Sequence, residues 1–432
     1  MRRNIVILTG AGAALPWGAP TTKVLTDLIR KDTEFQTKTS GPLGEYLYLL
    51  LRKHYSTDPD SVNFETIIDA LEDLYDFISA AKSEGYHEFK THLPAIFQQI
   101  ESVNEEILDR VAVYPKRSIS GIPVTTGELY PVLDDDASYL ATAIRHFINM
   151  IVDAIDRYES DVHTNRFDSV SAAFRRFIQF AEDNFRVRYY TLNYDQFPAR
   201  FGYSWFSGFE DSGGVLQISP NRILDDDRSQ VSYNLHGSIH FNEGPTGHWT
   251  LTPSSSNHVN GGSNLHDQKG RAMLRSNILT GLSKPSRILQ DPFNLFLQRF
   301  SLDCRNADLI VTIGYSGGDP HVNKAIQQRF DLPNPRFMGV GYIHQFETAL
   351  GSDGFMDPWI DEWRDAQIGF PKGDAFDERI DLKWRSDDWI LSQKKLKAFY
   401  CRGTQRFLET NAYLSCTRFT FGLRGHRGVY FY

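Results

Sequence analysis

The sequence predicts an α/β protein built on a Rossmann-like, mostly parallel sheet. Short apolar segments alternate along the chain with segments of helical period, which is typical of this class. Several of the short segments are apolar on both faces, as buried parallel strands are. Most of them run directly into turns rich in glycine and polar residues. The predicted strands are Ile5–Thr9, Val187–Leu192, Val231–Leu235, Leu309–Ile313 and Phe337–Ile343.

The first strand opens the segment IVILTGAGAA at residues 5–14, which has two interpretations. A secretory signal peptide needs about 7–15 unbroken apolar residues, and this run is interrupted at Thr9 and Gly10. A helix is predicted over Thr21–Arg30, because its apolar residues recur at helical spacing. Strand, glycine turn and helix is the order of a phosphate-binding turn. In it, Gly10 and Gly12 are expected to take positive φ and let a pyrophosphate approach.

Helical patterns dominate the long stretch between the first two strands. We expect residues 1–36 and 166–345 to form the nucleotide-binding domain, 37–165 a helical insertion, and 346–432 an α+β extension. Helices are predicted over Val62–Ala81, Ser138–Tyr158, Phe167–Asn184 and Val322–Phe330. Loops are predicted over Tyr114–Asp136 and Thr250–Ser286, and a terminal hairpin over Thr417–Leu423 and Val429–Tyr432.

Composition narrows the class of protein. The 432 residues are 41% hydrophobic and 23% charged, with a net charge of −8, so wholesale binding to nucleic acid is not indicated. No run approaches the ~20 apolar residues of a membrane span. The three cysteines include no CxxC pair, which excludes a disulfide framework and a four-cysteine zinc site. We expect a cytoplasmic protein. We also expect no bound metal, since His236 and His240 are four positions apart but lie in a predicted strand and turn.

Polar residues follow the predicted strands at the edge where α/β sheets bind ligands. Asn193 and Asp195 follow the second strand within TLNYD, and His236 follows the third within HGS. The turn GYSGGD over 314–319 follows the fourth. Taken singly, these residues could cap helices, pack in a core or form plain turns. Their coincidence at four strand ends favours a ligand site.

In this order, GAG, TxNxD, HGS and GxS resemble the NAD-binding core of the sirtuin fold, over residues 5–320. The resemblance implies that Asn193 and Asp195 lie around the nicotinamide ribose and that His236 is the catalytic base. An amide such as Asn193 can hold a water or the carboxamide, and a carboxylate such as Asp195 can stabilise developing positive charge. The cofactor-binding residues would be Gly10, Ala11, Gly12, Ala14, Pro16, Trp17, Thr191, Gly314, Tyr315, Ser316 and Asp319.

Departures from the sirtuin pattern point to one branch of the family. Deacylating sirtuins carry two CxxC pairs, a serine at the position of Ala14, and glutamine at that of Leu192. They have an Asp-Phe-Arg stretch where this chain has Pro16-Trp17-Gly18. The combination resembles the bacterial antiphage-defence branch, whose members hydrolyse NAD and in some cases act beside a HerA-type ATPase.

The resemblance implies that NAD is a substrate, cleaved to nicotinamide and ADP-ribose so that an infected cell loses its NAD. Two alternatives remain open: an NAD-dependent protein deacylase, and a subunit that senses NAD or ADP-ribose without turnover. A nuclease is less favoured, because no carboxylate cluster stands out. We also expect a homo-oligomer whose assembly, or a partner such as a HerA-type ATPase, controls the site. The insertion and the aromatic C-terminal region, with Trp359, Trp363, Trp384 and Trp389, are the candidate surfaces.

Overall fold

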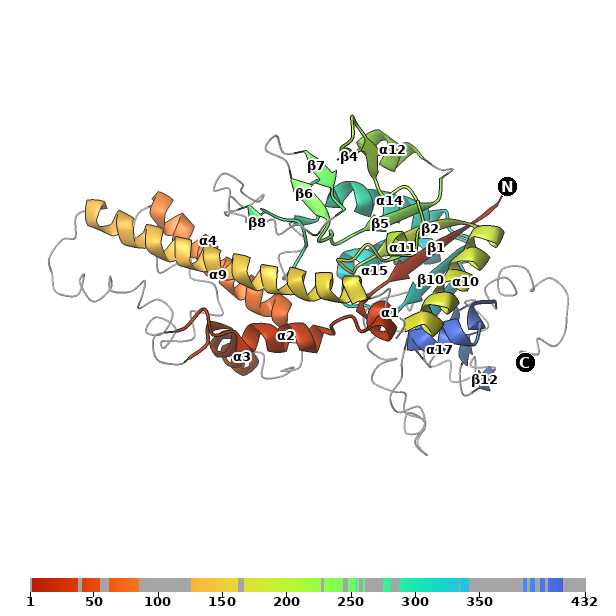
Figure 1. The fold of residues 1–432 in the computed structure, drawn as a ribbon, viewed down its shortest axis with the longest axis horizontal. Coiled ribbons are helices and arrows are strands. Elements are labelled where there is room, and N and C mark those ends of the chain that lie inside the picture. Colours follow the sequence, from red (N-terminus) through yellow and green to blue (C-terminus); the bar gives the residue numbers. More distant parts are fainter. Residues whose placement is uncertain are drawn as a thin grey trace. The chain divides into compact units, whose positions relative to one another are not determined.

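A sheet of eight strands organises the first of two compact units of the chain (Figure 1). Its order is β12-β13-β14-β11-β10-β1-β2-β5. The parallel strands are β1 (Arg3–Thr9), β2 (Phe185–Thr191), β5 (Val231–Asn234), β10 (Leu309–Ile313), β11 (Phe337–Val340) and β14 (Lys397–Tyr400). At one edge, β12 (Trp384–Ser386) and β13 (Trp389–Ser392) continue it in antiparallel fashion.

The parallel strands fill the sheet outward from β1 in two directions. β2 and β5 extend it one way, and β10, β11 and β14 extend it the other way. This is the strand order of a Rossmann fold, so the predicted α/β class and the Rossmann-like, mostly parallel sheet are confirmed. The order reverses between β1 and β10, and the crevice at such a switch point is where these sheets bind ligands.

The computed structural model describes most of the two units. The described residues are 2–37, 41–54, 62–84, 126–161, 167–226, 229–243, 248–253, 255, 259–260, 275–280, 287–333, 335–341, 384–386, 389–392, 397–400 and 403–414. The predicted terminal hairpin, Trp359, Trp363 and the last residues of the predicted fifth strand lie outside them.

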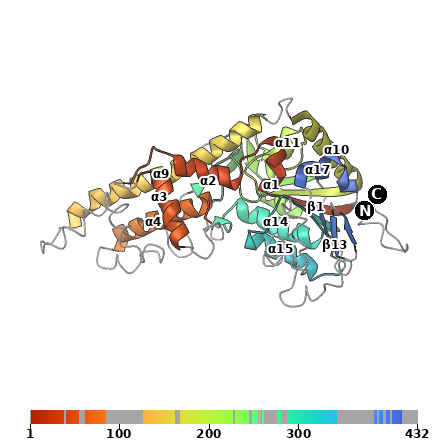
Figure 2. The same cartoon turned by 90° about the horizontal axis from the view of Figure 1, so that it is seen from below.

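Helices cover both faces of the sheet (Figure 2). On one face α10 (Asp168–Asn184) packs against α17 (Gly403–Glu409), where the rings of Phe177 and Phe407 lie 6.0 Å apart. On the other face α14 (Phe293–Arg305) packs against α15 (Pro320–Phe330). The shorter helices are α1 (Ala11–Ala14), η1 (Leu15–Trp17), α11 (Phe197–Arg200), α12 (Pro220–Asp225) and η5 (Ala412–Leu414).

A small antiparallel sheet belongs to the same unit. Its strands, in the order β3-β4-β7-β6, are β3 (Phe209–Asp211), β4 (Leu216–Ile218), β7 (Trp249–Leu251) and β6 (Phe241–Glu243). The sequence did not predict this sheet, because strands of three residues are too short to show an alternating pattern.

The second unit comprises residues 20–156 and 255–289 and is helical. Its helices α2 (Thr22–Lys31), α3 (Leu43–His54) and α4 (Phe64–Glu84) pack on one another through apolar faces. The side chain of Thr21 accepts a hydrogen bond of 3.1 Å from the N–H of Val24 and so caps α2. A two-stranded ribbon, β8 (Val259–Asn260) with β9 (Arg275–Ser276), also lies in this unit.

The unit boundaries differ from the expected ones. α2 belongs to the helical unit rather than to the Rossmann domain, because its buried residues Leu25 and Ile29 face α3 and α4. Residues 403–414 of the expected C-terminal extension belong to the Rossmann unit, and β14 is a strand of its sheet.

One long helix replaces part of a predicted loop. α9 runs over Thr126–Asp161, so the acidic run at 134–136 lies in a helix and not in the loop predicted over Tyr114–Asp136. The loop was predicted because Pro131 usually ends a helix. In the described residues no helix is long and apolar enough to cross a bilayer.

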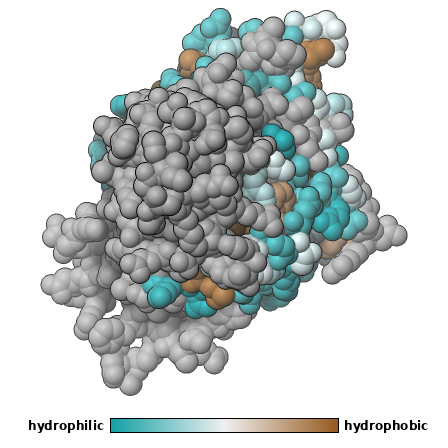
Figure 3. Space-filling model, turned by 90° about the vertical axis from the view of Figure 1, so that its left-hand side faces the viewer, coloured by the Kyte–Doolittle hydropathy of each residue, from teal (hydrophilic) through white to brown (hydrophobic). Residues whose placement is uncertain are grey.

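Figure 3 shows the hydropathy of one face of the molecule. Among the described residues coloured there, hydrophilic ones predominate and hydrophobic ones form small groups. The exposed large hydrophobic residues of the described chain are few, such as Leu49, Leu289 and the adjacent Val215 and Leu216. A few such residues are ordinary on a protein surface, and the expected homo-oligomer stays a prediction.

Candidate active site

Four turns leave the sheet at one level. Thr9 at the end of β1 pairs with Ile313 on β10 and with Thr191 on β2, and Thr191 pairs with Asn234 on β5. Every predicted motif therefore begins within two residues of one row across the sheet. Asn193 follows Thr191 by two residues, and His236 follows Asn234 by two. Since β2 and β5 are neighbours, these two side chains leave the same edge from adjacent strands.

The two glycine turns at the switch point pack directly on each other. The N–H of Gly12 donates to the carbonyl of Gly314 at 3.0 Å, and the N–H of Gly10 donates to Ile313 at 3.0 Å. A Cβ on Gly12 would lie 2.9 Å from the Cα of Gly314, so a side chain has no room there.

This packing corrects the expected backbone of the first turn. Gly10 is extended with φ −115°, Gly12 lies in α1, and the positive φ of 62° belongs to Gly314. The N–H groups of Gly10 and Gly12 also donate within the protein. The glycines are therefore required for backbone-to-backbone packing, and the exposed residue of this turn is Ala11.

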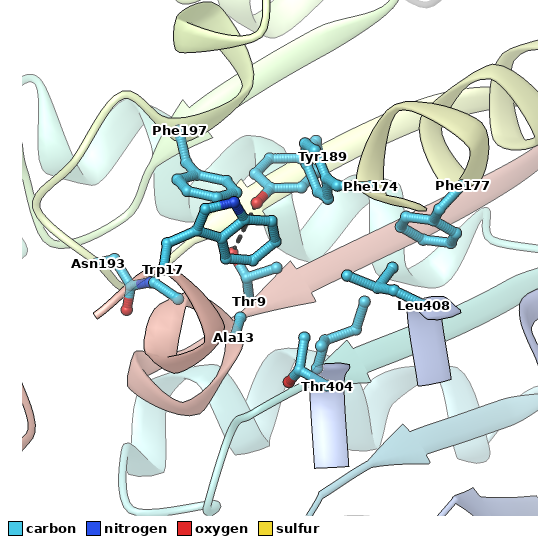
Figure 4. Close-up of a pocket in the computed structure, with 12 residues that line it drawn as sticks. Thr9, Ala13, Trp17, Phe174, Phe177, Tyr189, Asn193, Phe197, Thr404 and Leu408 are labelled. Atoms are coloured by element: carbon cyan, nitrogen blue, oxygen red, sulfur yellow. Dashed lines mark hydrogen bonds between the residues drawn. The ribbon is translucent and has the colours of Figure 1, made fainter. Parts of the chain in front are cut away.

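An apolar pocket opens beside α1 (Figure 4). Its interior has a volume of about 20 Å³, roughly the room that one water molecule needs. Trp17 forms one wall and donates through Nε1 to the hydroxyl of Ser171 at 3.0 Å. Asn193 lies at the edge of the pocket, and Thr9 contacts the hydroxyl of Tyr189 at 3.0 Å. The remaining lining residues are Ala13, Ala14, Phe174, Phe177, Phe197, Ile313, Thr404 and Leu408.

The loop that carries Asn193 is held by hydrogen bonds from side chains of β2, of β5 and of the turn after β5. The hydroxyl of Thr191 accepts the N–H of Asn193 at 3.0 Å. The side-chain amide of Asn234 donates to the carbonyls of Asn193 and Asp195, at 3.1 and 2.7 Å. The hydroxyl of Ser238 donates to the carbonyl of Tyr194 at 2.9 Å. These bonds satisfy the carbonyls of the loop and fix its position relative to the sheet.

Asp195 points into the protein rather than toward the crevice. Its carboxylate is 2% exposed, and it accepts a hydrogen bond of 2.7 Å from the hydroxyl of Tyr158 and one of 3.2 Å from the N–H of Phe197. Burial, and after it the negative charge of Glu159, raise the pKa of Asp195 to about 7. The expected position of this carboxylate beside a ribose differs from the position that the structure gives it.

Glu159 anchors the same buried network. Burial alone would raise its pKa, but hydrogen bonds and charge from His240, the N–H of Gln196 and Arg200 outweigh burial and lower the pKa. Its Oε2 lies 2.8 Å from Nε2 of His240 and 2.7 Å from Arg200. His240 is therefore held in an ion-pair network and does not extend into the crevice.

His236 meets a second histidine from across the sheet. Its Nε2 lies 3.1 Å from Nε2 of His321 and 3.7 Å from Oδ1 of Asp319. Both partners belong to the beginning of α15, which follows β10, whereas His236 follows β5. The turn after β10 thus reaches across the ends of β1 and β2.

Tyr315 holds this turn in place from the inside. It is 4% exposed, and its hydroxyl donates to Asn323 at 2.7 Å, while the side-chain amide of Asn323 donates to the carbonyl of Gly317 at 2.6 Å. Burial raises the pKa of Tyr315 well above its usual value. Tyr315 therefore supports the turn, whereas Ser316 is exposed and Asp319 is half-buried.

The predicted site residues fall into two groups. Residues at the crevice surface are half-buried or exposed, namely Ala11, Gly12, Pro16, Asn193, Gly314, Ser316 and Asp319. His236, though 2% exposed, meets this group through Asp319 and His321. The others are buried supports, namely Gly10, Ala14, Trp17, Thr191, Asp195 and Tyr315.

Sequence reasoning missed His321, Asn234 and the Tyr158–Glu159 pair. Asn234 lies next to the end of the strand predicted over Val231–Leu235, and a polar residue there is a usable signal. His321 and Glu159 become neighbours of the motifs only in the fold, and no spacing reveals them.

Comparisons with known proteins add little. No protein-family model matches the chain, and no curated protein matches it. Among solved structures, a Sir2 homologue with a serine-to-alanine mutation, in complex with ADP-ribose, superposes with a TM-score of 0.29. It is 13% identical, and the alignment covers 84% of this chain and 93% of that one. A Sir2 homologue with a histidine-to-asparagine mutation, also in complex with ADP-ribose, superposes with a TM-score of 0.30 and is 12% identical. That alignment covers 85% of this chain and 92% of the other. Superpositions this loose carry no argument, and the fold rests on the sheet order above.

Proposed function

We propose that this protein hydrolyses the bond between nicotinamide and ribose in NAD⁺, giving nicotinamide and ADP-ribose. The observation that carries the proposal is the common level of the four motif turns at the switch point of a Rossmann sheet. A dinucleotide binds across such a crevice, and here Asn193 and His236 follow two adjacent strands at its edge.

The chemistry requires little of the protein beyond placement. The pyridinium of NAD⁺ is a good leaving group, and the transition state resembles an oxocarbenium ion. Asn193 can hold the attacking water or the carboxamide, because an amide both donates and accepts. His236 accepts a proton from that water or from a ribose hydroxyl.

The pocket beside Asn193 has aromatic and aliphatic walls and few polar groups. Its interior of about 20 Å³ holds roughly one water molecule, so the proposal places the nicotinamide ring in the crevice next to Asn193 and not inside this pocket. Asp195 keeps a supporting role in this proposal, because its carboxylate is buried against Tyr158.

The biological setting follows from the family resemblance. We propose that NAD depletion serves antiphage defence, with activity held in check by self-association or by a partner such as a HerA-type ATPase. A protein deacylase or a sensor without turnover would use the same crevice, so products must be measured directly.

The test is chromatographic detection of nicotinamide and ADP-ribose after incubation with NAD⁺, with and without an acyl-lysine peptide. We expect both products without the peptide, and a loss of about 100-fold or more in Asn193→Ala and His236→Ala. Asn184→Ala is the matched control, since this amide precedes β2 at the opposite edge of the sheet. Peptide-dependent products would identify a deacylase. Tight NAD binding without products would identify a sensor.

A further inference from the structure

Three metal-ligating side chains converge where the two halves of the sheet meet. The ring nitrogens Nε2 of His236 and His321 lie 3.1 Å apart, and Oδ1 of Asp319 lies 3.7 Å from the first of them. One ligand atom from each residue lies within 4.8 Å of the others. Among the described residues, these three form a group of histidine and acidic side chains close enough together to hold one metal ion.

The separation of the two imidazole nitrogens is close to that in a tetrahedral zinc site. At zinc–nitrogen distances of about 2.0–2.1 Å, two nitrogen ligands of a tetrahedral ion lie roughly 3.3–3.4 Å apart. The two imidazole nitrogens are already within a few tenths of an ångström of that separation. Two histidines and one carboxylate are also a ligand set that zinc uses when a fourth position stays open.

The site is built, because its ligands are held by the fold. The hydroxyl of Tyr315, which donates to Asn323, accepts the N–H of Asp319 at 3.2 Å. The side chain of His236 is 3% exposed, and that of Asp319 is 20% exposed. A small ion can therefore reach the site beside Asp319, and His236 lies at the buried end of the site.

Two facing imidazole nitrogens and a carboxylate favour a cation between them. A pair of neutral rings can share one hydrogen, but both nitrogens can give their lone pairs to a metal ion at once. The negative charge of Asp319 adds to that preference. We infer that His236, His321 and Asp319 bind one Zn²⁺ ion, with the fourth position open to water.

The consequence rests on the proposed function. A zinc ion takes the Nε2 lone pair with which His236 would accept a proton. The metal therefore acts as a reversible inhibitor of NAD cleavage. From the sequence we expect no metal, since the pair considered there is His236 and His240. His321 lies 85 positions from His236, so no ligand spacing links these two histidines.

Binding is tested without any activity assay. The full-length protein is stripped with a chelator, dialysed against Zn²⁺ and analysed for bound zinc, and a Co²⁺-loaded sample is examined for the visible absorption of four-coordinate cobalt. We expect one tightly bound ion per chain. His321→Ala and Asp319→Asn should each weaken binding at least tenfold, with circular dichroism confirming their fold.

A matched histidine controls for surface binding. His146 lies 3.0 Å from Asp32 and 3.4 Å from Glu34 and thus pairs with carboxylates rather than with a facing imidazole, so His146→Ala should bind zinc like the wild type. A His258→Ala, His266→Ala double variant controls for the loop histidines. Zinc binding that is absent, or that is unchanged in both ligand variants, would overturn the site.

The inhibitory role has its own arm. Zinc should suppress nicotinamide release by the wild type, and Asp319→Asn should require at least tenfold more zinc for the same suppression. Activity that is lost with chelator and restored with zinc would overturn inhibition. If the protein cleaves no NAD at all, the proposed function fails, whereas the binding experiment still decides the site.

Discussion

The hydroxyl of Tyr158 donates a hydrogen bond of 2.7 Å to Asp195, a carboxylate that is almost fully removed from water. The bond joins the last turn of α9 to the loop after β2, at a position two residues after Asn193. A buried acid in this position has a pKa near 7, so the stability of the site depends on pH around neutrality.

The first prediction concerns that dependence. The pKa of Asp195 is raised in the folded state to about 7, from about 3.9 in an unfolded chain. The folded protein therefore binds more protons between these values, and its free energy of unfolding falls as pH rises through this window. Asp195→Asn stays neutral, and it should remove on the order of 2–3 kcal/mol of the decline between pH 5 and pH 8. Urea unfolding at several pH values measures this, and parallel curves for variant and wild type would contradict it.

The second prediction concerns Asn234 as a positioning residue. Asn234→Asp keeps the size of the side chain but cannot donate to the carbonyls of Asn193 and Asp195. We expect a loss of about 1–3 kcal/mol in stability. Because Asn193 loses its placement, we also expect kcat for nicotinamide release to fall about 100-fold, with a smaller change in KM. An unchanged kcat in the folded variant would show that Asn234 is structural only.

The third prediction concerns the contact of the two glycine turns. Gly12→Ala places a Cβ 2.9 Å from Gly314 and should lower the free energy of unfolding by about 1–3 kcal/mol. Gly12→Val should lower it further. Gly318→Ala is the control, since the nearest atom to its Cβ, in Ser316, is 3.9 Å away, and it should stay within about 0.5 kcal/mol. If Gly12→Ala weakened NAD binding without loss of stability, the turn would instead contact the ligand.

The fourth prediction concerns a buried ion pair behind the sheet. Asp303 accepts hydrogen bonds from Arg188 at 2.6 Å and from Arg299 at 2.7 Å, and both arginines are almost fully buried. Asp303→Ala leaves two buried cations without this anion and should cost about 3–5 kcal/mol. Thermal or urea unfolding checks it. A cost below about 1 kcal/mol would mean that water reaches the arginines.

The fifth prediction concerns assembly. We expect light scattering at micromolar concentration to show a homo-oligomer, since an unregulated NAD hydrolase would deplete its own host. The result that sinks this expectation is a monomer with full hydrolytic activity.

Much of the parallel sheet was predictable from sequence. Strands such as Leu309–Ile313 are apolar on both faces, and that pattern is specific to strands buried between two layers of helices. The ends of β2 and β5 were also predictable, because polar residues follow each apolar run. The helix α9 was harder, since Pro131 normally ends a helix and here does not.

The roles of individual site residues were less predictable. Asn193 and Asp195 are two positions apart and look alike in sequence, yet one lies at a pocket and the other is buried against Tyr158. Which way each points depends on partners 37 and 41 positions away. The meeting of His236 with His321 depends on the path of the turn after β10, which only the fold determines.

The pairing of β1 also constrains how the protein is made. Along the chain β1 precedes its partners, which begin at Phe185 and Leu309, and β14 at the far side of the sheet begins at Lys397. During synthesis one hydrogen-bonding edge of β1 therefore stays unpaired until β2 has been made, and the other until β10 has been made. Long-range parallel pairing of this kind is slow and exposes apolar strands to aggregation. The crevice lies between turns that follow β1, β2, β5 and β10, so it can form only after the chain has been made as far as the beginning of α15, and a shorter nascent chain lacks the assembled site.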